Sequence, residues 1–295
     1  MTRMQTWGGV AGKRVVISGA TNGIGLAAAV ELARRGALLT LIARSQSRAA
    51  DAMRRIQAAK AGATVDVLIA DLAAQADIRR LASQLLARYS RIQVLVNNAG
   101  AVYRGRQLSP DGIELTWAVN HLAPFLLTTL LLDRLKASAP ARIVTTSSGA
   151  HQGATIPFDD LTTNRGAGYS GFPRYGQTKL ANILFTTELA RRLDGTGVTA
   201  NAFHPGFVAS GFNRNNGLLM RIGMGLTRPF ARSAEKGAET LVWLVDFEDA
   251  GQFSGDYFFD KRLATPSAAA QDPEAARRLW QLSEDEVRAS AAERT

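Results

Sequence analysis

Short runs of aliphatic and β-branched residues alternate along this chain with longer stretches in which apolar positions recur roughly every three or four residues. The short runs predict buried strands, and the longer stretches predict amphipathic helices. Predicted strands span residues 14–18, 38–43, 64–70, 93–97, 142–146, 198–203 and 254–259. Predicted helices span residues 26–35, 47–61, 74–89, 111–137, 173–193, 234–245 and 273–292. This alternation predicts an α/β fold, a doubly wound parallel sheet of about seven strands with helices on both faces.

No internal repeat and no linker divides the chain, so we expect a single domain over residues 1–295. Two segments interrupt the alternation. Residues 149–172 are rich in glycine and show no periodicity, which predicts a long loop. Residues 207–232 carry apolar side chains among glycines after a strand, which predicts either a substrate lid or a surface helix packed on the body.

The composition is that of an ordinary soluble globular protein, with 46% hydrophobic and 20% charged residues. The absence of cysteine excludes disulfides, thiolate chemistry and cysteine metal sites. His121, His151 and His204 have no metal-ligand spacing, so no metal site is expected. The net charge of +10 is spread along helices and loops without an aromatic-basic cluster. This pattern argues against nucleic-acid binding and favours a surface that attracts phosphorylated cofactors or substrates.

The chain shows no sequence signal for a membrane. The first 12 residues lack the apolar stretch of a signal peptide. The longest apolar run, residues 122–132, has 11 residues and contains Pro124. A membrane-spanning helix needs about 20 residues. We therefore expect a cytoplasmic protein without a membrane anchor.

A glycine-rich turn joins the first predicted strand to the first predicted helix. Its residues are Ser18-Gly19-Ala20-Thr21-Asn22-Gly23-Ile24-Gly25. Glycines let the backbone approach a pyrophosphate closely, and the N-terminus of the following helix offers free N–H groups to it. The spacing GxxxGxG departs from the GxGxxG form of dinucleotide sites. A tight turn that packs the helix on the sheet is therefore the alternative.

The ends of later strands carry further candidate cofactor contacts. Arg44 follows the second strand, where NAD-binding folds place an acid for the ribose 2′-hydroxyl, and a guanidinium there suits a 2′-phosphate. We therefore expect NADP(H) in preference to NAD(H), the alternative being a solvated arginine. Asp71-Leu72 would meet the adenine or cap the next helix. Asn97-Asn98-Ala99-Gly100 would line the cleft or form a plain turn.

Tyr175 and Lys179 stand four residues apart and project from one face of a predicted helix. The pKa of a free phenol is about 10. A neighbouring ammonium lowers that pKa, which suits proton transfer to a carbonyl or from an alcohol. Two surface side chains without chemistry are the alternative. Asn120, inside the apolar run 117–125, must find hydrogen-bond partners, and Ser147-Ser148-Gly149 ends the fifth strand.

Taken together, these motifs resemble the short-chain dehydrogenase/reductase superfamily, single-domain branch, over about residues 12–260. The glycine turn, the Asn-Asn-Ala-Gly run, Asn120, Ser148, Tyr175 with Lys179, and Pro205-Gly206 occur in the order expected for it. Residues 119–128, 147–151 and 179–185 are similar to the retinol dehydrogenase-like group. The resemblance implies a Rossmann-type fold.

The resemblance also implies a role for each motif residue. Tyr175 would be the general acid/base, and Lys179 would lower its pKa and hydrogen-bond the nicotinamide ribose. Ser148, the second serine of its pair, would hold the substrate oxygen, and Asn120 would anchor a water that connects Lys179 to solvent. Ser210 would contact the carboxamide. The cofactor-binding set implied in full is Ser18, Gly19, Thr21, Asn22, Gly23, Ile24, Gly25, Arg44, Asp71, Leu72, Asn98, Ala99, Gly100, Tyr175, Lys179, Pro205, Gly206, Val208 and Ser210.

The function that follows from the resemblance is an NADP(H)-dependent oxidoreductase that interconverts an apolar ketone or aldehyde with its alcohol. A catalytically silent NADP(H)-binding sensor or scaffold on the same fold is the alternative. A sugar-nucleotide epimerase or dehydratase is a third hypothesis, although its GxxGxxG spacing is not found here. Subunit pairing through the helices that carry Asn120 and Tyr175 would give a homodimer or homotetramer.

Overall fold

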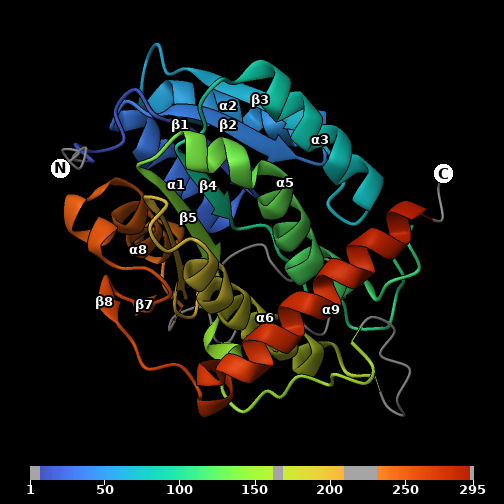
Figure 1. The fold of residues 1–295 in the computed structure, drawn as a ribbon. Coiled ribbons are helices and arrows are strands. Elements are labelled where there is room, and N and C mark those ends of the chain that lie inside the picture. The colour runs from blue at the N-terminus through green and yellow to red at the C-terminus, as the bar shows by residue number, and fades with distance from the viewer. Residues whose placement is uncertain (1–6, 162–168, 209–230, 293–295) are drawn as a thin grey trace.

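The computed structural model describes residues 7–161, 169–208 and 231–292, which form one α/β unit around a single sheet (Figure 1). In these residues the sheet has eight strands in the order β3-β2-β1-β4-β5-β6-β7-β8. Its strands are β1 Arg14–Ser18, β2 Leu38–Ala43, β3 Val65–Ile69, β4 Val94–Asn97, β5 Ala141–Thr146, β6 Val198–Phe203, β7 Tyr257–Phe259 and β8 Arg262–Leu263. Strands β1 to β7 pair in parallel, which confirms the predicted α/β class.

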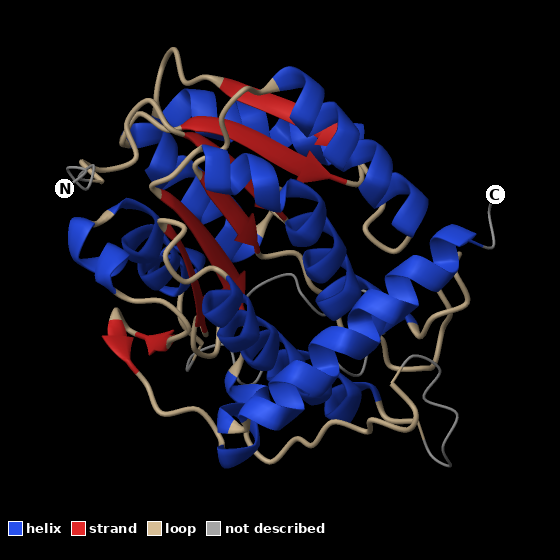
Figure 2. Ribbon diagram, in the orientation of Figure 1, coloured by secondary structure: helices blue, strands red, loops and turns tan. Residues whose placement is uncertain are grey.

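Helices flank both faces of this sheet (Figure 2). The α-helices in the described residues are α1 Gly23–Arg34, α2 Gln46–Ala59, α3 Gln75–Arg88, α4 Leu115–Trp117, α5 Ala123–Ala137, α6 Gly171–Arg192, α8 Ala234–Asp246 and α9 Pro273–Ala292. Short helical turns are η1 Ala118–Leu122, η2 Gly149–His151, η5 Glu248–Gln252 and η6 Ala268–Gln271. Every predicted helix is therefore present, with its ends shifted by up to a few residues.

Strand side chains alternate between two apolar layers. Val15 and Ile17 of β1 belong to a buried cluster with α1, α2 and α8, whereas Val16 belongs to a cluster with α3, α5, α6 and α9. This alternation follows from the two-residue period of a strand. Because both faces are covered, the central strands are apolar throughout, as the sequence pattern indicated.

The sheet differs from the prediction at its β7–β8 edge. The predicted strand 254–259 shortens to Tyr257–Phe259, because Gly255 has a φ of +91° and leaves the extended region. The missed strand β8 pairs antiparallel with β7 after a tight turn at Asp260 and Lys261, whose φ values are 50° and 61°. Hairpin turns of this kind favour Asn-Gly or Asp-Gly, so this pair carries no clear sequence signal.

The predicted helix 111–137 begins later, at Leu115, and contains a π-helical turn, η1. Glu114 ends the preceding loop by accepting hydrogen bonds from the backbone N–H groups of Thr116 and Trp117, at 2.9 and 3.0 Å. The continuous stretch Leu115–Ala137 is long and apolar enough to cross a membrane, and 72% of its most apolar window is buried inside the protein. Such burial is the ordinary situation of a core helix.

The C-terminal helix α9 lies along α6, on the outer side of the layer that contains α3, α5 and α6 (Figure 1). Trp280 of α9 stacks on Phe185 of α6 with ring centroids 5.8 Å apart, and it meets the edge of Phe125 of α5 at 5.0 Å. Helix α9 starts at Pro273, as predicted, and the Asp272 side chain before it accepts hydrogen bonds from the first backbone N–H groups.

Candidate active site

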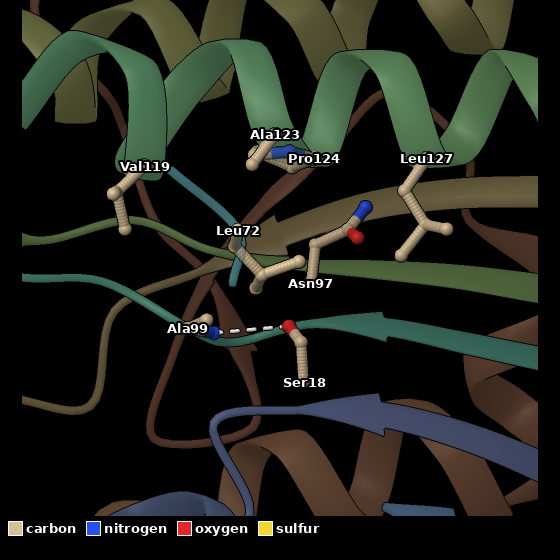
Figure 3. A pocket seen from close by; sticks show the side chains of 8 residues that line it. All are labelled: Ser18, Leu72, Asn97, Ala99, Val119, Ala123, Pro124 and Leu127. Atoms are coloured by element: carbon tan, nitrogen blue, oxygen red, sulfur yellow. Dashed lines mark hydrogen bonds between the residues drawn. The ribbon is translucent and has the colours of Figure 1, made fainter. Parts of the chain in front are cut away.

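The carboxyl ends of the parallel strands form a crevice where the strand order reverses, between β1 and β4. Open α/β sheets bind ligands at this switch point. Ser18, at the end of β1, donates to the Val96 carbonyl at 3.3 Å and accepts from the backbone N–H groups of Asn98 and Ala99 at 3.0 and 3.1 Å. Figure 3 shows the Ser18–Ala99 bond in a small pocket beneath η1 and α5. Its lining residues are Ser18, Leu72, Asn97, Ala99, Val119, Ala123, Pro124 and Leu127.

The glycine turn lies at this crevice and leads into α1. Gly19 and Gly23 have φ values of +68° and +51°, which side-chain-bearing residues rarely adopt. A Cβ on Gly25 would lie 2.3 Å from the Gly19 carbonyl oxygen, so only glycine lets α1 approach the turn this closely. Asn22 precedes α1 without a side-chain capping bond, in contrast to the serines that cap α2 and α8. Uncapped N–H groups at such a helix start fit a phosphate.

The other strand ends extend the crevice. Arg44 follows β2 on the exposed surface, and its charge opposes the rise that burial causes in the pKa of Tyr103, which lies in the loop after β4. Sequence reasoning missed Tyr103, because nothing local links it to Arg44. Asp71 accepts a hydrogen bond from the Ala73 N–H at 3.0 Å and so holds the turn before α3. The Asp71 side chain therefore stabilises the turn before α3, a role similar to the helix-capping alternative.

Lys179 lies in the third turn of α6 and is 2% exposed. Its Nζ donates to the Thr146 carbonyl at 3.0 Å and lies 5.4 Å from the centre of the Tyr175 ring. A Cβ on Gly100 would come within 3.5 Å of the same Nζ, which places the Asn-Asn-Ala-Gly turn against Lys179. Burial lowers the pKa of Lys179 to about 8.

Tyr175 is one turn earlier on the same helix, and the Ser148 hydroxyl lies close enough to its phenol to affect the phenol's pKa. Burial raises the pKa of Tyr175 to about 12, and the neighbouring Ser148 hydroxyl opposes this rise. The predicted lowering of the Tyr175 pKa is therefore wrong. Desolvation of the phenolate outweighs the opposing effect of Ser148.

Ser148, rather than Ser147, faces the tyrosine. Ser147 is 1% exposed and donates to the Lys179 carbonyl at 2.8 Å, which turns its hydroxyl into α6. Ser148 precedes η2, and its Oγ accepts from the Ala150 N–H at 3.2 Å. The two neighbouring serines thus point in different directions, because side chains alternate at the end of a strand.

Asn120 lies inside the π turn η1 and is fully buried. Its Oδ1 accepts from the Ala101 N–H, and its Nδ2 donates to the Ala101 carbonyl, both at 2.8 Å. Nδ2 also donates to Thr178 of α6 at 3.1 Å. The hydrogen-bond partners that we expected for Asn120 therefore lie in the loop after β4 and in α6, the helix that carries Tyr175. π turns occur often at functional sites.

Pro205, Gly206 and Val208 follow β6 on the same side of the sheet. A Cβ on Gly237 of α8 would lie 2.7 Å from Val208 and 3.4 Å from Ile24 of α1, so this segment meets the start of α1. Val208 forms a β-bridge with Arg232, which pairs with Asp260. Ser210 and the central part of the predicted lid, residues 209–230, lie outside the described residues.

Two contacts that set the site geometry had no sequence signal of their own. A Cβ on Gly176 would lie 2.6 Å from the Ala150 carbonyl oxygen, so glycine beside Tyr175 lets the Ser148 turn rest on α6. Arg174, on the other side of Tyr175, forms a fully buried ion pair with Glu114 at 2.8 Å. Both contacts join segments far apart in sequence.

A glycine turn at the sheet switch point, with serine, tyrosine and lysine converging beside it, defines a dinucleotide-dependent oxidoreductase of the short-chain dehydrogenase class. The family model for short chain dehydrogenases matches residues 13–159. Mouse retinol dehydrogenase 12 is 43% identical over 274 residues, 93% of this chain and 86% of its own. The chain therefore belongs to the short-chain dehydrogenase/reductase family, in its retinol dehydrogenase-like group.

Bacterial relatives and solved structures agree with this assignment. A Streptomyces protein named as a candidate daunorubicin C-13 ketoreductase is 40% identical over 94% of this chain and 93% of its own. A crystal structure of an uncharacterised Mycobacterium paratuberculosis protein superposes with a TM-score of 0.77, at 32% identity over 96% of this chain and 98% of that one. The Pseudomonas aeruginosa RhlG/NADP complex gives a TM-score of 0.68, at 25% identity over 92% of this chain and 100% of that one.

Proposed function

We propose that this protein is an NADP(H)-dependent oxidoreductase that interconverts an apolar ketone or aldehyde with its alcohol, with Tyr175 as the general acid/base. The observation that carries the proposal is the convergence of Ser148, Tyr175 and Lys179 at one strand end, beside the glycine turn. When bound, the cofactor supplies or accepts the hydride at its nicotinamide ring. The protein residues then have to hold the substrate oxygen and move one proton.

The charge states of the site suit carbonyl reduction. Because the pKa of Tyr175 is raised to about 12, the phenol keeps its proton at neutral pH and can donate it to a carbonyl oxygen. The Ser148 hydroxyl, beside the same phenol, can hold that oxygen by a second hydrogen bond. The Lys179 ammonium stabilises the phenolate that remains after proton transfer. Asn120, between Ala101 and Thr178, supports the loop and helix that enclose Lys179.

Apolar surface beside Tyr175 supports an apolar substrate. Phe172 is 64% exposed, and its ring lies 6.3 Å from that of Tyr175. Exposed aromatic rings near a polar reaction centre are typical of a binding site for an apolar ligand. The names of the relatives, which refer to retinol and to a daunorubicin C-13 ketone, agree with this class.

The test follows NADPH absorbance while the purified protein meets retinal, medium-chain aldehydes, steroids and cyclic ketones. We expect turnover on an apolar class and a loss of roughly 100-fold or more in kcat for Tyr175→Phe, the typical contribution of general acid catalysis. Tyr89→Phe is the matched control, since that phenol bonds Asp66 at 2.8 Å, away from the crevice. Full turnover by Tyr175→Phe would contradict the mechanism. NADPH binding without turnover on any compound would favour the sensor alternative.

The preference for NADP(H) is proposed from Arg44, an exposed guanidinium at the end of β2. Arg44→Ala is expected to weaken NADPH binding by about tenfold or more and to leave NADH binding unchanged, because only the former carries a 2′-phosphate. Arg54→Ala is the control, since it removes the same charge from the exposed face of α2, where Arg54 pairs with Asp51. Equal affinities for the two cofactors in the unaltered protein would contradict this preference.

A further inference from the structure

His151 lies behind the active-site serine, in the turn η2, and is 1% exposed. Its backbone N–H donates to the Ser148 carbonyl at 3.1 Å, and its ring Nδ1 contacts the same carbonyl at 2.7 Å. The other ring nitrogen, Nε2, lies 3.1 Å from the backbone N–H of Ser267, which precedes η6. One imidazole thus joins the active-site turn to the segment before the C-terminal helix.

The two partners determine the form of the His151 ring. A carbonyl oxygen only accepts, so Nδ1 must carry the hydrogen. A backbone N–H only donates, so Nε2 must present its lone pair. The ring is therefore neutral and holds a single tautomer. Burial lowers the pKa of His151, which agrees with a neutral ring. A protonated ring would direct Nε2–H at the Ser267 N–H and lose that bond.

The His151 ring is held on its other sides by packing. Tyr257 of β7 meets it edge-on with ring centroids 5.1 Å apart, and the Tyr257 hydroxyl lies 3.5 Å from Nδ1. On the opposite side of the turn, the Ala150 carbonyl rests against Gly176 of α6. The Ser148 turn is thus clamped between α6, which carries Tyr175, and the segment that runs from Tyr257 to Ser267.

We propose that His151 is a positioning residue for Ser148. By donating to the Ser148 carbonyl, the ring fixes the peptide plane after Ser148, and the Ser148 Oγ is thereby directed at Tyr175. The Ser267 N–H selects the tautomer that can make this donation. The role rests on the proposed function, because it acts through the serine that holds the substrate oxygen.

Two substitutions at His151 separate its contacts. The amide nitrogen of asparagine reaches about the place of Nδ1, and the amide of glutamine about the place of Nε2. We expect His151→Gln to lower kcat by about tenfold, with NADPH affinity unchanged, because a small misplacement of a catalytic group is enough for such a loss. His151→Asn should stay within about threefold of the unaltered protein. Wild-type kcat in His151→Gln, or equal losses in both variants, would overturn the proposal.

A double-mutant cycle tests whether His151 acts through Ser148. In a Ser148→Ala background, His151→Gln should cause no further loss of kcat, because the group that it positions is gone. A second loss of about tenfold in that background would overturn the proposal and assign His151 an independent role.

An NMR readout needs no substrate and separates this inference from the proposed function. Ring ¹⁵N shifts of the unliganded protein should show the Nδ1–H tautomer of His151, without titration near the usual histidine pKa of about 6.5. The groups that face the ring are Tyr257 and, beyond it, His204 with the Arg232–Asp260 pair. The ¹³C shift of the Ser148 carbonyl should move in His151→Gln and not in His151→Asn.

These shifts decide the inference even if no carbonyl compound is turned over. An Nε2–H tautomer, a ring that titrates normally, or a Ser148 carbonyl shift that is identical in all three proteins would overturn it. Absence of turnover with the expected shifts would count against the proposed function alone.

Discussion

Burial moves the pKa values of Tyr175 and Lys179 in opposite directions, and in both residues it favours the neutral side chain. The pKa of Tyr175 rises to about 12 and that of Lys179 falls to about 8. Lys179 is almost completely enclosed, and its ammonium donates to the Thr146 carbonyl. A charge at this position is poorly solvated, so a protonated Lys179 lowers the stability of the folded protein.

The pH dependence of the free energy of unfolding should reveal this destabilisation by Lys179. The folded pKa of Lys179, about 8, lies below its ordinary value of 10.5, so between these values the unfolded chain binds more protons than the folded one. Stability should therefore rise as pH increases from 8 towards 10, by about 1 kcal/mol per pH unit from this group. The measurement is urea unfolding at several pH values, in parallel with Lys179→Met.

Lys179→Met isolates the effect, because other groups titrate in the same range. Burial also lowers the pKa of Lys13. Tyr175 acts with the opposite sign, but only above its ordinary value of 10.0. The rise with pH should be smaller in the variant, and parallel curves for the two proteins would contradict the prediction.

At the scale of elements, a buried ion pair fixes the start of α6 relative to the start of α4. Glu114 and Arg174 are both inaccessible to solvent and lie 2.8 Å apart. Glu114 also caps α4 and accepts from the Tyr169 hydroxyl at 3.0 Å, while Arg174 donates to the Leu161 carbonyl and lies over the Trp117 ring. Burial alone would raise the pKa of Glu114, but hydrogen bonds from Arg174 and the backbone hold it below its usual range.

Breaking this pair should be costly. Glu114→Gln is expected to lower the free energy of unfolding by about 3–5 kcal/mol, because it leaves the Arg174 charge buried without its partner. Denaturant unfolding measures the loss. Glu274→Gln is the control, since Glu274 pairs with Arg277 on the exposed face of α9 and should change stability by less than about 1 kcal/mol. A similar small change in both variants would show that the buried pair contributes no more than a surface pair.

At the scale of the whole molecule, α9 covers the outer face of the layer formed by α5 and α6. Trp280, Leu279 and Ala276 are buried in the cluster that contains the apolar side chains of both helices. Arg192 of α6 lies over the Trp280 ring, 4.2 Å from its centroid. The chain thus places its own helix where the sequence led us to expect a second subunit.

We therefore expect the protein not to pair through α5 and α6. Light scattering on the eluting protein should give a mass near 31.6 kDa, the mass of one chain. Trp280→Ala should lower stability by about 3–5 kcal/mol, because it opens a cavity between α9 and α6. A stable dimer whose dissociation is promoted by Trp280→Ala would contradict this arrangement and make α9 part of a subunit interface.

Local pattern alone determined most of the fold. β-branched runs and helical periodicity located seven strands and the main helices, because these signals depend on neighbours a few residues apart. Asn120, Ser148, Tyr175 and Lys179 were likewise found as local motifs, and the structure brings them to one strand end. The sequence could not show β8, whose turn at Asp260 and Lys261 lacks the usual residues, nor the π turn around Asn120.

Only the tertiary structure decided which neighbours these residues have. His151 meets Ser267 across 116 positions and Arg174 meets Glu114 across 60, so no periodicity could link them. The same holds for Tyr103 with Arg44 and for α9 on α6. The pKa of Tyr175 is the clearest case: spacing on one helix predicted a lowered value, and enclosure by distant segments raised it. Desolvation depends on all the atoms packed around a group, whereas the sequence gives only its neighbours along the chain.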